Sequence, residues 1–234
     1  MVDWHNFYKE SDRPGVADLS RFDPWQERLA DRIIQSGPQS VLEAGCGYGQ
    51  TGYLIAEHLG RSVTQLDFQG APLRTARRFF DQGHGWGQFV QGDLLHLPFA
   101  NGYFDLVFNA GVLEHFHFSD RCQALAEMIR CVRTGGKVIV ALPNHYSTPY
   151  RYSYLYRQKK RRWPYPDEHA IYDLQEEAQT LCFPVSRARE TLCPETAYHF
   201  LRRHQRIFFK LLNLVCHFEG YLSVLTFVKQ PDRS

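Results

Sequence analysis

A glycine-rich turn between an apolar strand and a helix is the feature that most constrains this chain. The apolar run Val41–Ala44 predicts a short buried strand, and residues 51–59 predict a helix. Between them stand Gly45, Gly47 and Gly49. Glycines let backbone N–H groups and a helix N-terminus approach a nucleotide-like ligand. The dinucleotide fingerprint needs another glycine where this chain has Gln50, so the spacing disfavours NAD.

Strand and helix patterns then alternate along the chain. Near-continuous apolar strands separated by helices predict a parallel sheet that is covered on both faces. We therefore predict an α/β, Rossmann-like, doubly wound sheet. The predicted strands are residues 41–44, 61–67, 88–91, 104–109, 137–142, 185–192 and 221–228, and the predicted helices are 25–35, 51–59, 72–80, 120–130, 173–181 and 195–219.

Acidic residues stand at the ends of the first three strands. In an open parallel sheet, ligands bind at the carboxyl ends of the strands. Glu43 precedes the glycines, and Asp67 is placed where a carboxylate can accept both hydroxyls of a ribose. Asp93 could accept a hydrogen bond from the exocyclic amine of an adenine, and Phe68 and Leu94 could enclose the base. Together with the missing glycine, this set points to S-adenosylmethionine (SAM).

The order and spacing of these motifs resemble the class I SAM-dependent methyltransferases. The resemblance is strongest to the small-molecule group often called type 11 methyltransferases. It covers about residues 41–143 and also rests on the runs 92–99, 104–107 and 112–115. It implies a seven-stranded, mostly parallel sheet whose last strand is antiparallel. It also implies that the cofactor contacts Glu43, Gly45, Gly47, Gly49, Asp67, Phe68, Asp93, Leu94, Asn109 and Ala110.

The remaining segments predict a partial helical cap on a single domain of residues 1–234. Residues 1–36 would supply N-terminal cap helices, and residues 144–217 a substrate-cap insertion. Residues 144–166 are rich in Tyr, Arg and Pro without a clean period. The basic run at 157–162 is typical of a solvated face, and it could also anchor an acidic or membrane partner.

Three histidines are candidates for a general base: His115, His169 and His145. An imidazole titrates near neutrality, so it can accept a proton from an acceptor that must lose one. His115 and His117 also form an H-x-H pair, but no third ligand follows at a recognisable spacing. We therefore predict no metal site.

The near-neutral net charge does not favour binding to nucleic acid. Lys plus Arg number 27 and Asp plus Glu 25, a net charge of +2, so no DNA partner is expected. No segment predicts a signal peptide or a membrane span. The six cysteines form no C-x-x-C pair, which favours a reducing, cytoplasmic location. A homodimer is one possible assembly of the chain.

These observations predict a methyltransferase that moves the sulfonium methyl of SAM to an oxygen, nitrogen or carbon atom of a small molecule. A SAM-binding sensor or scaffold without catalysis is the main alternative, because this fold requires no signature catalytic residue. An NAD-dependent oxidoreductase is disfavoured by Gln50 and by the lack of a Tyr-x-x-x-Lys pair on a predicted helix. A nucleic-acid or protein methyltransferase is disfavoured by the near-neutral charge.

Overall fold

One seven-stranded sheet forms the centre of the computed structural model, which describes residues 21–181 and 185–231. Its strands lie in the order β3-β2-β1-β4-β5-β7-β6, and β7 runs antiparallel to both β5 and β6. The predicted α/β sheet with an antiparallel last strand is therefore confirmed. The strands are β1 Val41–Ala44, β2 Ser62–Asp67, β3 Trp86–Gln91, β4 Phe104–Ala110, β5 Val132–Pro143, β6 Val185–Leu192 and β7 Leu222–Lys229.

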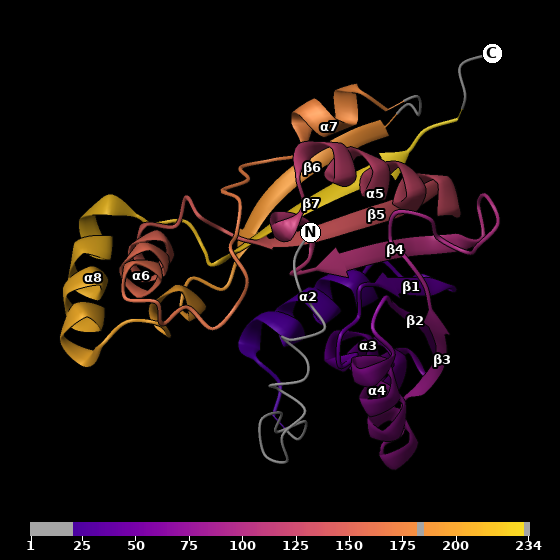
Figure 1. Ribbon diagram of the computed structural model, residues 1–234, viewed down its shortest axis with the longest axis horizontal. Helices are drawn as coiled ribbons and strands as arrows, with labels where there is room; N and C mark the ends of the chain where they lie inside the picture. Colours follow the sequence, from indigo (N-terminus) through magenta and orange to yellow (C-terminus); the bar gives the residue numbers. More distant parts are fainter. Residues whose placement is uncertain (1–20, 182–184, 232–234) are drawn as a thin grey trace.

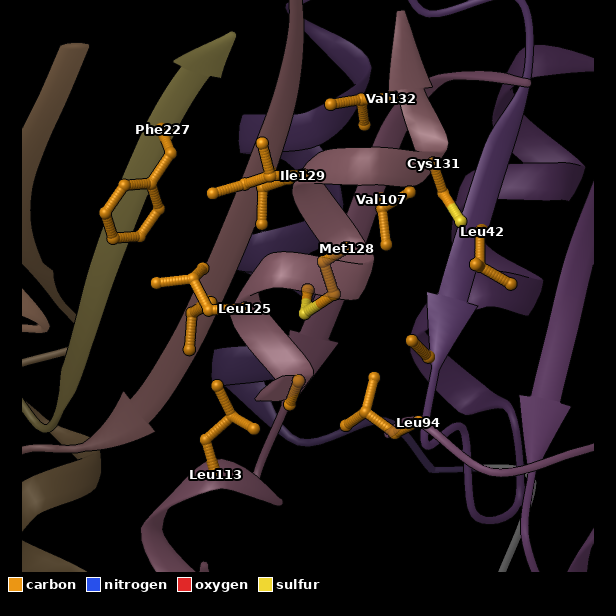
Figure 2. Packing of buried hydrophobic residues seen from close by; sticks show 14 of the residues in the cluster. Leu42, Leu94, Val107, Leu113, Leu125, Met128, Ile129, Cys131, Val132 and Phe227 are labelled. Atoms are coloured by element: carbon orange, nitrogen blue, oxygen red, sulfur yellow. The ribbon is translucent and has the colours of Figure 1, made fainter. Parts of the chain in front are cut away.

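Side chains of the central strands alternate between two apolar layers. On β4, Val107 belongs to one core, while its neighbours Leu106 and Phe108 belong to the other. The first core lies beneath helix α5 (Phe118–Cys131), and Figure 2 shows its residues between that helix and the sheet. Because both faces of these strands are buried, their sequences are predominantly apolar, as the parallel-sheet prediction requires.

Helices cover the two faces of the sheet in separate groups. Helices α2 (Pro24–Ile34), α3 (Gln50–Leu59) and α4 (Gly70–Gln82) lie on one face (Figure 1). Helix α5 and the short α7 (Gln175–Gln179) lie on the other. Asp23 precedes α2, and its N–H donates to the Gln26 side chain at 2.8 Å, so this helix begins where Asp23-Pro24 predicted.

The glycine pair near the start of β5 interrupts the pairing of β5 with β4. The register passes from Phe104 opposite Val132 to Leu106 opposite Lys137. Gly135 has φ +77°, which lets the chain bulge there. The predicted strand 137–142 therefore begins earlier, at Val132, and the glycine bulge lies inside β5.

The segment 144–217 contains more regular structure than its sequence indicated. Helix α6 (Thr148–Lys159) and helix α8 (Arg203–Cys216) pack beside each other, and the Tyr152 and Phe209 rings lie 5.3 Å apart. Figure 1 shows this pair beyond the carboxyl ends of β4 and β5. In the same segment β6 joins the sheet, so only part of residues 144–217 lies outside the sheet.

The single helix predicted over 195–219 was wrong. A short 3-10 turn, η2 (Thr196–Tyr198), and α8 divide the segment. Tyr198, Leu201 and Phe209 form a small cluster of their own. A continuous helix would spread these side chains along its axis, whereas the break near Arg202 brings them together.

The predicted N-terminal cap lies largely outside the described residues, which begin at residue 21 and include only α2 from that segment. Among the described residues, no helix combines the length and apolar composition that crossing a bilayer requires.

Candidate functional site

A cavity of about 310 Å³ opens at the carboxyl ends of the parallel strands. The strand order reverses between β1 and β4, and this switch point is where open α/β sheets bind ligands. The loops that follow β1, β2, β3 and β4 all contribute to the lining. Eight predicted site residues line the cavity: Gly45, Gly47, Asp67, Phe68, Asp93, Leu94, Ala110 and His115.

The glycine turn folds tightly against the end of β2. The N–H groups of Gly45 and Cys46 both donate to the Leu66 carbonyl, at 2.7 and 2.9 Å. Gly45 has φ +82°, and a Cβ there would lie 2.9 Å from Val112 Cγ2. A larger residue would strain the backbone and press on the β4 loop, so this position requires glycine. Burial raises the pKa of the Cys46 thiol well above its usual value, which keeps it uncharged.

Asp67 connects the ends of β1 and β2. One carboxylate oxygen accepts a hydrogen bond from the Gly47 N–H at 2.8 Å, and the other accepts from the Gln69 N–H at 2.8 Å. The residue is 7% exposed, and burial raises the pKa of its carboxyl. A carboxylate held by two backbone N–H groups keeps further lone pairs for hydroxyl donors in the cavity.

Asp93 and Leu94 form the next part of the cavity wall, after β3. The Asp93 carboxylate accepts from the Leu95 N–H at 2.9 Å, which fixes this turn. Leu94 is buried in the core beside α5 (Figure 2). Phe68 is 62% exposed, although it lines the cavity. The Phe68 ring, the aliphatic Leu94 side chain and the hydrogen-bond acceptor Asp93 thus all border the cavity.

Glu43 and Gly49 lie behind the cavity rather than on its wall. The Glu43 carboxyl accepts from the Gly52 N–H at 2.9 Å, within the first turns of α3. Burial raises the pKa of Glu43 to about 8, so it is largely protonated at neutral pH. Gly49 has φ +69° and is the N-cap residue of α3. Both residues support the turn that carries Gly45 and Gly47.

Asn109 is fully buried and does not line the cavity. Its side-chain amide donates to the Ala44 carbonyl and so joins the ends of β4 and β1. Among the described residues, its Oδ1 atom has no hydrogen-bond partner. The neighbouring Ala110 does line the cavity, because side chains on successive positions of a strand point to opposite faces.

His115 is the one of the three candidate bases that borders the cavity. Its Nδ1 atom lies 2.9 Å from the Asp167 carbonyl, which can only accept, so Nδ1 carries a proton. In the neutral ring, Nε2 is then the basic atom; it lies 3.8 Å from Glu114 Oε1. Burial lowers the pKa of His115 and raises the pKa of the Glu114 carboxyl, which favours the uncharged form of each group.

His169 lies near this site but does not line the cavity. Its backbone N–H donates to the Glu114 carbonyl at 2.7 Å, which fastens the cap segment to the loop after β4. Its ring lies 5.4 Å from that of His117, a cavity-lining residue. Partial burial, Arg121 and His117 together lower the pKa of His169.

His145 belongs to a buried network below the cap helices. Its Nδ1 accepts from Arg151 at 3.0 Å, so Nε2 carries the proton and donates to the Glu168 carboxylate at 2.9 Å. The Tyr150 hydroxyl donates to the same carboxylate oxygen at 2.7 Å. Both ring nitrogens of His145 are therefore engaged within the protein.

Sequence reasoning missed part of the cavity wall. Gly111, Val112 and Phe116 also line it, because the chain after β4 turns back over the strand ends before α5 begins, and Asp120 lines it from the first turn of α5. Their position between an apolar strand and a helix, at the same edge as Asp67, is the signal that could have found them. Within the described residues, no group of three or more His, Cys, Asp or Glu side chains is arranged to hold a metal ion.

Comparisons with known proteins point to one family. Residues 41–136 match the family model described as "Methyltransferase domain". The methyltransferase GfsG of Streptomyces halstedii is 32% identical over 117 residues, 49% of this chain and 41% of that protein. A demethylmenaquinone methyltransferase of Thermus thermophilus is 31% identical over 117 residues, 50% of this chain and 52% of that protein. The chain thus spans about half the length of these curated relatives.

A solved structure agrees over nearly the whole chain. A SAM-dependent methyltransferase from Thermotoga maritima superimposes with a TM-score of 0.65 and 18% identity, covering 97% of this chain and 100% of that one. At this identity the likeness shows the fold. The matched residues 41–136 thus resemble a methyltransferase domain, and the fold agrees with the one that the predicted SAM-dependent methyltransferase family implies.

Proposed function

We propose that this chain is a class I SAM-dependent methyltransferase that methylates a small molecule at an oxygen, nitrogen or carbon atom, since residues 41–136 match a methyltransferase domain. The observation that carries the proposal is the cavity at the switch point of the sheet. It gathers Asp67, Asp93 and the glycine turn, the groups that the sequence pattern assigned to SAM. An elongated nucleoside ligand has polar and apolar partners along this wall.

Each part of the wall suits one part of SAM. Asp67 is the acceptor for the ribose hydroxyls, because its buried carboxylate is held by the N–H groups of Gly47 and Gln69. The adenine binds between Leu94 and Phe68, next to Asp93. The methionine portion binds against Ala110 and the turn at Gly45 and Gly47. Glu43, Gly49 and Asn109 act from behind, by holding the turn and the strand ends in place.

SAM bound here supplies an electrophilic methyl group on a sulfonium centre. The protein's task is then to place an acceptor atom in line with that methyl and to exclude competing water. His115, Phe116 and His117 border the cavity on the β4–α5 side, so the acceptor approaches along this side. The insertion at residues 144–217 completes the acceptor side, because the Asp167 carbonyl fixes the His115 ring.

His115 serves as general base when the acceptor must lose a proton. Its Nδ1–H donates to the Asp167 carbonyl, so Nε2 is the basic atom of the neutral ring. Burial lowers the pKa of the ring, which favours the unprotonated form that a general base requires. His169 assists through its contact with Glu114 and His117, and His145 through the network around Glu168.

Methyl transfer is tested directly with methyl-labelled SAM and pools of phenols, amines and carboxylic acids. The proposal expects labelled product with one pool and stoichiometric S-adenosylhomocysteine. Protein that binds SAM but labels no acceptor, even in a crude metabolite extract of its source, would contradict catalysis and favour a sensor. We retain the cytoplasmic location and the homodimer as predictions; light scattering on purified protein would test the latter.

A further inference from the structure

One side of helix α8 presents large apolar side chains to solvent. Leu211, Leu214 and Val215 are 63%, 75% and 78% exposed, and Ile207 and Phe208 are also exposed. At 3.6 residues per turn these five positions fall on one side of the helix, from Ile207 to Val215. A contiguous exposed apolar surface of this kind marks an interaction site. We refer to these five side chains as the α8 apolar stripe.

The stripe does not hold α8 on the protein. The opposite side of the helix does so through Phe209, which is 6% exposed and packs with Tyr198 and Leu201. Gln205 adds a hydrogen bond to the Tyr152 hydroxyl of α6 at 3.1 Å. Helix α8 is therefore anchored on one side, and its other side is available to a partner.

A row of cations borders the stripe. Arg203, Arg206 and Lys210 are exposed and follow one another at helical spacing along its edge. The sequence of α8, Arg203–Cys216, contains no Asp or Glu.

More cations lie close to the start of α8. The Arg202 guanidinium lies 5.8 Å from the centre of the Tyr156 ring, which places the start of α8 beside the end of α6. The end of α6 continues into Lys159, Lys160, Arg161 and Arg162, all exposed. Helices α6 and α8 thus bring the apolar stripe and the basic groups to the same end of the molecule, the end that Figure 1 shows farthest from the sheet.

We propose that this surface docks the protein on an anionic lipid bilayer, with α8 lying in the interface. An apolar helix side flanked by Lys and Arg is the chemistry that binds a membrane surface. The helix lies at an outer edge of the molecule, where a flat bilayer can meet it (Figure 1). A second copy of the chain fits this surface less well than an anionic bilayer does. In a two-fold contact, the cations of both copies would face each other, and neither α6 nor α8 contains an Asp or Glu that could pair with them.

Vesicle flotation with the full-length protein tests the docking. The probes are vesicles of phosphatidylcholine alone and of phosphatidylcholine mixed with phosphatidylglycerol. Leu211→Glu disrupts the stripe, and Arg206→Gln/Lys210→Gln removes two cations. Matched controls are Tyr103→Glu, at an exposed aromatic residue elsewhere, and Arg61→Gln/Arg78→Gln, with the same charge change. Circular dichroism checks the fold of every variant.

The expected result is salt-sensitive flotation of the wild type with the anionic vesicles only. Leu211→Glu abolishes it, and the double cation variant weakens it by about fivefold for each charge removed. Both controls float like the wild type. Wild-type protein that does not float, or variants that float equally, would overturn the proposal. So would a wild-type dimer that Leu211→Glu dissociates in the absence of vesicle binding. If Leu211→Glu fails to fold, flotation of Arg206→Gln/Lys210→Gln and flotation of the wild type at increasing salt concentration test the proposal by themselves.

Discussion

The Asp67 carboxylate accepts a hydrogen bond from the Gly47 N–H at 2.8 Å, which ties the end of β2 to the glycine turn after β1. The same carboxylate accepts from the Gln69 N–H at 2.8 Å. The residue that the sequence assigns to the ribose therefore also shapes the turn assigned to the methionine portion. A change at Asp67 is expected to affect both parts of the proposed SAM site at once.

Gly52→Ala is expected to destabilise the fold. Glycine to alanine inside a helix ordinarily stabilises by about 0.5–1 kcal/mol. Here the new Cβ would lie 1.9 Å from Gln65 Nε2 and 2.5 Å from Glu43 Oε2, both buried, so overpacking should cost about 1–3 kcal/mol instead. Thermal unfolding measures the difference as a lower Tm.

Gly70→Ala is the matched control for this substitution. Gly70 begins α4, and the nearest atoms to its Cβ would be the ends of the Arg74 and Gln91 side chains, each at 3.2 Å. These flexible ends can move, so we expect a Tm equal to or above that of the wild type. Equal effects at both glycines would refute the packing of Glu43 and Gln65 against α3.

The pH dependence of stability should reveal the protonated Glu43. Burial raises the pKa of its carboxyl from 4.5 to about 8 in the folded protein. Between these values the folded state holds a proton that the unfolded state has released, so this group lowers stability as pH rises through the window. The slope is at most about 1.4 kcal/mol per pH unit.

Urea unfolding of the wild type and Glu43→Gln across this window isolates the contribution. We expect the wild-type free energy of unfolding to fall relative to that of the variant from about pH 4.5 to about pH 8, and to level off above it. A difference that is independent of pH would mean that Glu43 is ionised in the folded protein.

His115→Gln is expected to lower kcat by about a hundredfold or more for an acceptor that must be deprotonated, which is the usual contribution of a general base. The KM for SAM should stay near the wild-type value, because the base is proposed to act on the acceptor. Since burial lowers the pKa of His115, the acid limb of the wild-type kcat/KM profile should lie below pH 6.5.

His169→Gln provides the comparison, because His169 is exposed and outside the cavity lining. It should retain most of the activity and the same acid limb. A His115→Gln enzyme with an unchanged kcat and pH profile would exclude His115 as the base. A large loss of kcat in His169→Gln would instead identify His169 as the base.

The first half of the chain could be predicted closely because its local patterns and its packing agree. Val41–Ala44 and Phe104–Ala110 are mostly apolar, and most of their residues are buried, so the sequence pattern and the environment agree. Asp67 and Asp93 follow strands whose carboxyl ends meet at one edge, which brings them to one cavity without knowledge of side-chain contacts.

The cap could not be predicted in the same way because long-range contacts decide its structure. Residues 195–219 have helical spacing throughout, yet clustering of Tyr198 and Leu201 with Phe209 breaks the helix. Tyr150 and Tyr154 are buried on the inner side of α6, and the Tyr150 hydroxyl donates to the Glu168 carboxylate. The Tyr154 hydroxyl donates to the backbone carbonyl of the same residue. A sequence window contains no information about such a distant carboxylate, so His145 could not be placed either.

Titration calorimetry with SAM tests the central claim most directly. The wild type should bind SAM and S-adenosylhomocysteine at one site per chain. Asp67→Asn should bind at least about tenfold more weakly, since a hydrogen bond to a charged group contributes about 1.5–3 kcal/mol. Asp81→Asn, on the exposed end of α4, should bind like the wild type. An absence of binding heat in the wild type, or equal affinities for wild type and Asp67→Asn, would contradict the proposed SAM site.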